Sequence, residues 1–133
     1  FANTAPQLWT KIKVKNPYQD WSLGHVGELE TLYAPIRNTG DHGAWVTVQF
    51  IIKGPETFDL WSVEMWIGPG EVVTLSTDPF TLNLPGVYHY VVVVWFRLLN
   101  VYYLDPEPWY PYEAQLGGAG ICKETVNRIN VKA

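Results

Sequence analysis

Hydrophobic and polar side chains alternate along most of this chain, which is the period of a β-strand with one buried face. The clearest case is residues 44–53, where Val46, Val48, Phe50 and Ile52 share one face. The same pattern predicts strands over 8–15, 28–37, 58–67, 71–76, 87–104 and 121–132. An apolar period of 3.6 residues is nowhere sustained over three turns, so the chain belongs to the all-β class.

Several of these strands have features that indicate their place in a sheet. Residues 87–96 are apolar on both faces, which is typical of a central strand covered above and below. We expect 87–104 to form two consecutive strands or one long bent strand. Pro35 predicts a sheet edge or a bulge. In the segment 58–67, the predicted buried face consists of Trp61, Val63, Met65 and Ile67. In the segment 121–132, it consists of Val126 or Ile129 together with Val131.

Turn residues fall between the strands at regular intervals, as they do in small antiparallel sandwiches. Asn38 can bond its own backbone, and Gly40 is expected to supply a positive φ. Gly70 turns the chain, and Gly86 leads to Tyr88 in the manner of a tyrosine corner. This frame resembles the CARDB and related Ig-like domains of prokaryotic cell-surface proteins. The resemblance implies a single Ig-like antiparallel β-sandwich with extra N- and C-terminal strands.

The N-terminal strand lies outside that frame and alternates cleanly. Its apolar face carries Leu8, Ile12 and Val14, while Trp9 and three lysines lie on the other face. A lone module with extra terminal strands is similar to subunits of extracellular archaeal filaments and pili built by strand exchange. Residues 1–15 are then a donor strand and residues 16–133 the sandwich, with further copies of the chain as partners. Pairing within the same chain remains an equal alternative.

The first residues, Phe1-Ala2-Asn3, include no initiator Met. A removed leader peptide would account for this start, and leader removal implies export. We therefore expect an extracellular, surface-located protein. The stretch from Gly86 to Leu104 approaches the length of a membrane span, but its Arg97, His89, Asn100 and four Tyr argue against one.

Aromatic residues make up 15% of the chain, more than a core of this size requires. Some of these rings are expected to serve a partner. In the proline-rich loop 105–112, we expect Trp109, Tyr110 and Tyr112 to contact a neighbouring subunit. The alternative function is a carbohydrate-binding module that stacks exposed rings on surface glycans, using Trp45, Trp61, Trp66, Trp95, Trp109, Tyr110 and Tyr112. A viral coat subunit is a third functional hypothesis for the same fold.

Charge and chemistry exclude several other functions. The net charge of −4 and the scattered basic residues disfavour nucleic-acid binding. The single Cys122 forms no intrachain disulfide, and no Cys/His spacing suggests zinc, so we expect no cofactor and no metal. His25, His42 and His89 are not near a nucleophile in sequence, and no enzyme is predicted. Two acidic pairs have weak potential as cation or acid sites, Glu28 with Glu30 and Asp105 with Glu107. The solvated face of a strand is the favoured interpretation of Glu28 and Glu30.

Overall fold

The structure, a computed structural model, describes residues 12–41, 43–98, 101–102, 119–124 and 127–133. These residues form strands and connecting turns, and none of them belongs to a helix that could cross a membrane. The strands are β1 (Ile12–Val14), β2 (Tyr18–Gln19), β3 (Leu23–His25), β4 (Leu29–Glu30), β5 (Leu32–Asn38), β6 (Ala44–Lys53), β7 (Phe58–Trp61), β8 (Met65–Ile67), β9 (Val72–Ser76), β10 (Phe80–Thr81), β11 (Gly86–Leu98), β12 (Val101–Tyr102), β13 (Ala119–Glu124) and β14 (Ile129–Lys132).

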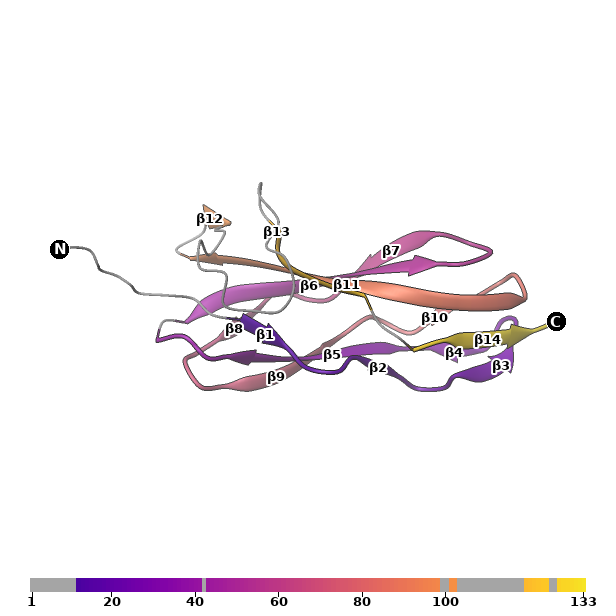
Figure 1. Cartoon of the computed structure of the whole chain (residues 1–133), viewed down its shortest axis with the longest axis horizontal. Coiled ribbons are helices and arrows are strands. Elements are labelled where there is room, and N and C mark those ends of the chain that lie inside the picture. The colour runs from indigo at the N-terminus through magenta and orange to yellow at the C-terminus, as the bar shows by residue number, and fades with distance from the viewer. Residues whose placement is uncertain (1–11, 42, 99–100, 103–118, 125–126) are drawn as a thin grey trace.

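The strands pack as two layers, which Figure 1 shows from the side. One layer is a four-stranded sheet in which β5 pairs with β1 and β2 along one edge and with β9 along the other. The other layer is an eight-stranded sheet in the order β3-β14-β11-β6-β7, to which β8, β12 and β13 are added. A short β4–β10 pair lies beside them. The predicted Ig-like sandwich with added terminal strands is therefore confirmed.

The core lies between the two layers and is built by the alternation of the longest strands. The predicted face of β6, with Val46, Val48, Phe50 and Ile52, is at most 1% exposed. From the facing sheet, β5 contributes Leu32, Ala34 and Ile36, all fully buried. On β11, the even-numbered residues from Tyr88 to Phe96 face this core, while Val91 and Val93 are buried on the opposite face. This strand is central, as its two apolar faces predict.

Three expectations about strand boundaries are wrong. Residues 28–37 form two strands in different sheets, because β4 ends at Glu30 and β5 begins at Leu32. Residues 58–67 do not form one strand, because β7 ends at Trp61 and β8 begins at Met65. The Ser62 hydroxyl oxygen accepts a bond from Val48 N at 2.9 Å where the sheet would otherwise continue. Of the four residues expected to share a buried face, only Ile67 is buried. The C-terminal segment likewise forms two strands, β13 and β14, rather than one, and Ile129 and Val131 of β14 are buried. Val126 lies outside the described residues.

Pro35 does not mark a sheet edge, because β5 is paired on both sides. It stands opposite the break between β1 and β2, where Lys15 N donates to Pro35 O at 2.9 Å. In an antiparallel ladder, the N–H and C=O of one residue point toward the same neighbour. The missing N–H of Pro35 therefore faces the break, where it costs no ladder bond. The strands β3 and β14 pair in parallel, which the antiparallel expectation did not include.

The turn residues of the frame act as predicted, with one exception. Asn38 is fully buried; its Oδ1 accepts from Gly40 N at 2.9 Å and its Nδ2 donates to Ile67 O at 3.0 Å. The Tyr88 hydroxyl donates to Leu84 O at 2.7 Å, which is the bond of a tyrosine corner. Gly70 and Gly86 have φ values of 80° and 141°. The described glycines with positive φ do not include Gly40, so the left-handed conformation predicted there is not found.

Candidate functional site

The first candidate site is the N-terminal strand β1 and the place it occupies beside β5. Ile12 and Val14 are 0% and 5% exposed and pack in the main core, whereas Lys13 faces solvent. Among the residues that the structure describes, the strand pairs along one edge, to Ile36–Asn38 of β5. Two of the predicted anchors, Ile12 and Val14, thus fill the sandwich of their own chain in this single-chain structure. The other two predicted residues, Leu8 and Trp9, lie outside the described residues.

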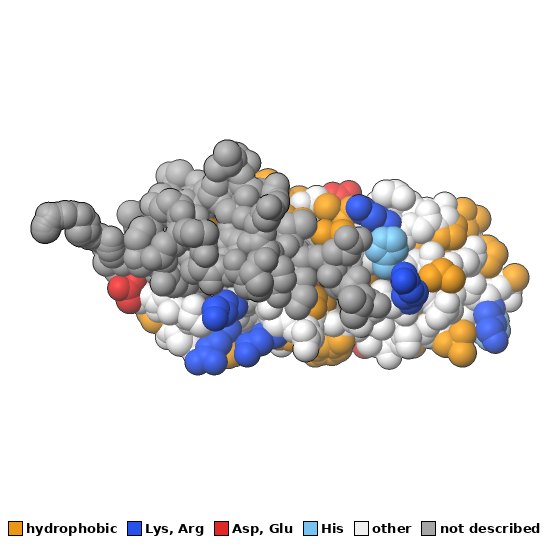
Figure 2. Space-filling view, in the orientation of Figure 1, with side chains coloured by type: hydrophobic (Ala, Val, Ile, Leu, Met, Phe, Trp, Pro, Cys, Tyr) orange, Lys and Arg blue, Asp and Glu red, His pale blue; other side chains and the backbone are white. Residues whose placement is uncertain are grey.

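Charge weakens this short pairing. Lys13 stands directly opposite Arg37 in the β1–β5 register, and both side chains are exposed. Like charges on directly opposed residues of one sheet face repel each other. Figure 2 shows Lys and Arg side chains gathered over the layer that contains β1 and β5. The strand is therefore held by two buried side chains and opposed by one unfavourable charge pair.

The second candidate site is the outer face of the larger sheet, which carries four of the tryptophans named above. Trp61 of β7 contacts Trp95 of β11 with ring centroids 6.0 Å apart, and Trp45 of β6 contacts Trp66 of β8 at 5.6 Å. Trp61 and Trp66 are each 49% exposed. Beside them, Trp95 Nε1 donates to Gln49 Oε1 at 3.0 Å, and Gln49 Nε2 donates to Asp59 Oδ2 at 2.7 Å.

The four indole rings do not form a flat platform. The ring planes of Trp61 and Trp95 differ by 41°, and those of Trp45 and Trp66 differ by 71°. A sugar platform would need three or more coplanar rings on one exposed face. The remaining aromatic candidates, Trp109, Tyr110 and Tyr112, lie outside the described residues, as do His42, Asp105 and Glu107.

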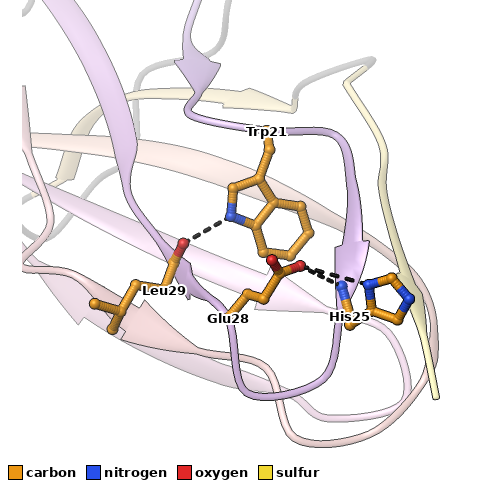
Figure 3. A network of polar contacts seen from close by, with 4 residues as sticks. All are labelled: Trp21, His25, Glu28 and Leu29. Carbon is orange, nitrogen blue, oxygen red and sulfur yellow. Dashed lines mark hydrogen bonds and ion pairs between the residues drawn. The ribbon is translucent and has the colours of Figure 1, made fainter.

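Glu28 and Glu30 do not share a solvated strand face, so that expectation is wrong. Glu28 lies in an exposed turn, where its Oε1 accepts from His25 N at 2.6 Å and lies 3.8 Å from His25 Nδ1. Figure 3 shows this turn, together with the Trp21 indole N–H that donates to Leu29 O at 2.7 Å. These bonds close the turn between β3 and β4. Glu28 therefore has a structural role as a turn cap.

Glu30, in contrast, is fully buried between the layers. Its Oε1 accepts from the backbone N–H groups of Trp21 and Thr31 at 3.2 and 3.1 Å, while its Oε2 has no hydrogen-bond partner. Burial raises the pKa of this carboxyl group from 4.5 to about 7. The sequence did contain a signal for this position, because Glu30 has the same parity as the buried residues Leu32, Ala34 and Ile36.

A set of polar side chains lies near Glu30 and joins the two ends of the described chain. The Tyr90 hydroxyl donates to Gln19 Oε1 at 2.9 Å. Asn127 Nδ2 donates to Pro17 O at 2.7 Å and to Gln19 Oε1 at 3.2 Å. Burial, with a smaller contribution from the charge of Glu30, raises the pKa of Tyr90 to about 12. These bonds fix the start of β2 against the segment that leads into β14.

Metal-ligating side chains do not cluster among the residues that the structure describes. No group of three His, Cys, Asp or Glu side chains in this part of the chain could hold a metal ion. His25, the last residue of β3, is exposed, and His89 is half-buried on β11 opposite Lys53.

Comparisons with known proteins support the fold. No family model and no curated protein matches this sequence. Among solved structures, a CARDB domain from Pyrococcus furiosus, solved in complex with di-metal ions, has a TM-score of 0.59 at 14% identity and covers 96% of this chain and 97% of its own. A β-glucosidase from Erythrobacter marinus (TM-score 0.54, 16% identity) covers 92% of this chain, and an alkylpurine DNA glycosylase from Pseudomonas fluorescens (TM-score 0.57, 13% identity) covers 93%.

The chain spans only 16% and 31% of these two larger enzymes. A likeness at such low identity concerns the fold alone. The described residues thus form a CARDB-like, Ig-like β-sandwich.

Proposed function

We propose that this domain is a structural subunit of an extracellular assembly, which polymerises by exchanging its N-terminal strand between neighbouring copies. The observation that carries the proposal is β1, a short strand whose one strand partner in the described part of the chain is β5 and which still buries Ile12 and Val14. In strand complementation, backbone bonds supply affinity and alternate side chains fill pockets. β1 offers both of these features in one short segment at the start of the described chain.

The connection after β1 suits an exchange. The pairing with β5 closes at the bond from Lys15 N to Pro35 O, and Asn16 and Pro17 then separate β1 from β2. If β1 leaves its own sandwich and enters that of a neighbour, it regains the same bonds and the same core contacts. Such a contact joins two different surfaces of the subunit, so it does not close and continues as a fibre. Copies of the chain are the partners, and an extracellular location agrees with the resemblance to surface-protein domains.

A disulfide test can distinguish exchange from pairing within one chain. Val14 and Ile36 stand opposite each other in the β1–β5 register. The next pair along the ladder, Lys15 and Pro35, forms a backbone hydrogen bond, so Val14 and Ile36 are a pair without backbone hydrogen bonds between them. Their Cα atoms should therefore lie about 4.5 Å apart, within the range of a disulfide. Two single-cysteine chains are made in a Cys122→Ser background, one with Val14→Cys and one with Ile36→Cys, and are mixed under mild oxidation during assembly.

Exchange predicts a disulfide-linked pair that contains one chain of each kind. The matched control replaces Val14→Cys with Lys13→Cys, which lies on the opposite face of β1 and should not reach residue 36. Electron micrographs of the parent protein should show polymers that withstand heat and detergent. A stable monomer at high concentration, unaffected by deletion of residues 1–15, would refute the proposal, as would a mixture that yields no linked pair.

Glycan binding on the tryptophan face is the second candidate function. It is favoured by the half-exposed indoles of Trp61 and Trp66, which lie beside the hydrogen-bonding groups of Gln49 and Asp59. Exposed indoles stack on apolar ring faces, and side-chain amides and carboxylates bond hydroxyl groups. Affinity electrophoresis against a panel of polysaccharides tests it, with Trp61→Ala as the variant and Tyr18→Ala, an exposed ring on the other sheet, as the control. Unretarded migration with unchanged Trp fluorescence would exclude it.

A further inference from the structure

The edge of the sandwich formed by β9 has an open backbone ladder. β9 pairs with β5 along one side and has no second strand partner among the residues that the structure describes. Figure 1 shows it at the margin of its layer. Natural edge strands are usually guarded against pairing by a proline, a charged residue or a bulge. β9, with the sequence Val72-Val-Thr-Leu-Ser76, contains none of the three.

The hydrogen-bond phase of β9 can be derived from its pairing with β5. Asn38 N donates to Glu71 O, and Thr77 N donates to Leu32 O, both at 3.0 Å. Hydrogen-bonded pairs recur at every second residue of an antiparallel ladder. Between these two bonds, the β9 residues whose backbone groups bond to β5 are therefore Val73 and Leu75. The N–H and C=O groups of Val72, Thr74 and Ser76 therefore point away from β5 toward the open edge.

The side chains at this edge are accessible. Val72 is 56% exposed, and Thr74 is exposed as well. Three residues with outward N–H and C=O groups can form six hydrogen bonds with another strand of the same phase. The occupant must therefore be an extended segment, and its side chains must avoid a charge clash with this edge.

We propose that the open edge of β9 pairs with β9 of a second copy of the chain, antiparallel about a two-fold axis through Thr74. In this register Val72 lies opposite Ser76 of the partner, and Thr74 lies opposite its own copy. Every outward N–H and C=O then meets an outward group of the partner, so all six bonds form. Glu71 falls opposite Thr77 and Gly70 opposite Asp78, which means that no like charges are juxtaposed. The Thr–Thr pair at the axis is one of the favourable cross-strand pairs.

Packing on the inner side agrees with the same occupant. Val73, half-buried at the rim of one core, would lie opposite Leu75 of the partner's β9. The two β5–β9 sheets would merge into one continuous sheet, and no open edge would remain on that side. This contact is isologous and closes at two copies, in contrast to the strand exchange proposed above. It does not depend on that exchange.

A single-cysteine chain tests the two-fold axis. Opposed residues that bond to each other in an antiparallel ladder have Cα atoms about 5.5 Å apart, which suits a disulfide. In a Cys122→Ser background, Thr74→Cys should give a covalent dimer on a denaturing gel after mild oxidation of the full chain. Val63→Cys, at a position 71% exposed and outside β9, controls for random collision. Equal dimer yields from the two variants, or no dimer from Thr74→Cys, would overturn the proposal.

The register has its own test. Mixing a Val72→Cys chain with a Ser76→Cys chain should give linked pairs that contain one of each, while neither chain alone should dimerise to the same extent. Thr74→Lys, which places two ammonium groups at the axis, should abolish these links while leaving the thermal unfolding temperature of the chain unchanged. If the links persist in Thr74→Lys, the axis is wrong. Because strand exchange is read through residues 14 and 36, each proposal can fail while the other stands.

Discussion

Glu30 is the residue whose environment departs most from what its chemistry favours. A carboxyl group is placed where water cannot reach it, with two backbone donors on Oε1 and no partner on Oε2. Burial disfavours the charged form, which is why the pKa rises to about 7. The folded protein therefore holds a proton between pH 4.5 and 7 that the unfolded chain has released.

The free energy of unfolding is expected to decrease as the pH rises from 4.5 through 7. A group with a raised pKa in the folded state contributes its full stability at low pH and loses it above that pKa. The difference between pH 5.5 and pH 8 should be at most about 2 kcal/mol, since most of the loss falls between pH 5.5 and the folded pKa of about 7 and one pKa unit corresponds to ~1.4 kcal/mol. Urea unfolding at several pH values measures it.

The variant Glu30→Gln should flatten this pH dependence and raise the urea midpoint at pH 8. The substitution keeps an acceptor for Trp21 N and Thr31 N but removes the buried charge. Glu28→Gln, two residues away in an exposed turn, is the matched control and should leave the slope unchanged. If both variants retain the parent's slope, Glu30 is not the group responsible.

Tyr88→Phe should lower the free energy of unfolding by about 1–2 kcal/mol, because two part-buried acceptors lose their donor, the hydroxyl group of a buried tyrosine. The hydroxyl group bonds Leu84 O at 2.7 Å and Glu56 Oε2 at 3.1 Å, so it holds the loop before β11. Chemical denaturation measures the loss. Tyr18→Phe, at a position 48% exposed, should change stability by less than half as much. Equal effects of the two substitutions would show that the tyrosine corner contributes nothing special.

At the level of elements, β1 is the strand whose pairing is most easily altered. Lys13→Glu turns the repulsion with Arg37 into an attraction across the same register position. Favourable cross-strand charge pairs contribute about 0.2–1 kcal/mol. The variant should therefore be more stable by about that amount in low salt, and the gain should shrink at high salt. Lys15→Glu, opposite the uncharged Pro35, is the control, and a similar gain there would point to net charge instead of the Lys13–Arg37 pair.

The strands that alternation predicts well are those with long, unbroken ladders, such as β6, β9 and β11. The prediction fails where a side chain replaces the ladder, as Ser62 does between β7 and β8. Elements of two or three residues, such as β2, β4 and β10, are too short to show a period. The parallel pairing of β3 with β14 joins residues more than 100 positions apart, and local pattern carries no information on it.

The candidate sites were less predictable than the fold for a related reason. The tryptophans could be found by composition, but the angles of 41° and 71° between their rings depend on neighbouring side chains from other strands. Glu30 was read as exposed because acidic residues seldom lie fully buried. Its parity with Leu32, Ala34 and Ile36 was the stronger signal, since strand register determines burial more than residue type does.

For the whole molecule, charge separates the N-terminal segment from the rest. Residues 1–15 contain Lys11, Lys13 and Lys15 and no acidic residue, so they carry +3. Since the whole chain carries −4, residues 16–133 carry −7. Opposite net charges speed the encounter of two molecules and have less effect when salt screens them. An N-terminal segment is therefore attracted to the body of any copy, its own or a neighbour's.

A synthetic peptide of residues 1–15 should therefore shorten the proposed polymers. The peptide offers the same anchors to the place beside β5 but has no sandwich of its own, so each subunit that takes it up ends a chain. Its effect should weaken in 1 M salt, where the screening length falls to about 3 Å. Filament lengths in electron micrographs give the measurement. A peptide of the same composition with Ile12 and Val14 exchanged for Lys11 and Lys13 keeps the charge but moves the anchors to the wrong face. If that peptide shortens the polymers equally, charge alone is responsible and β1 is not the exchanged strand.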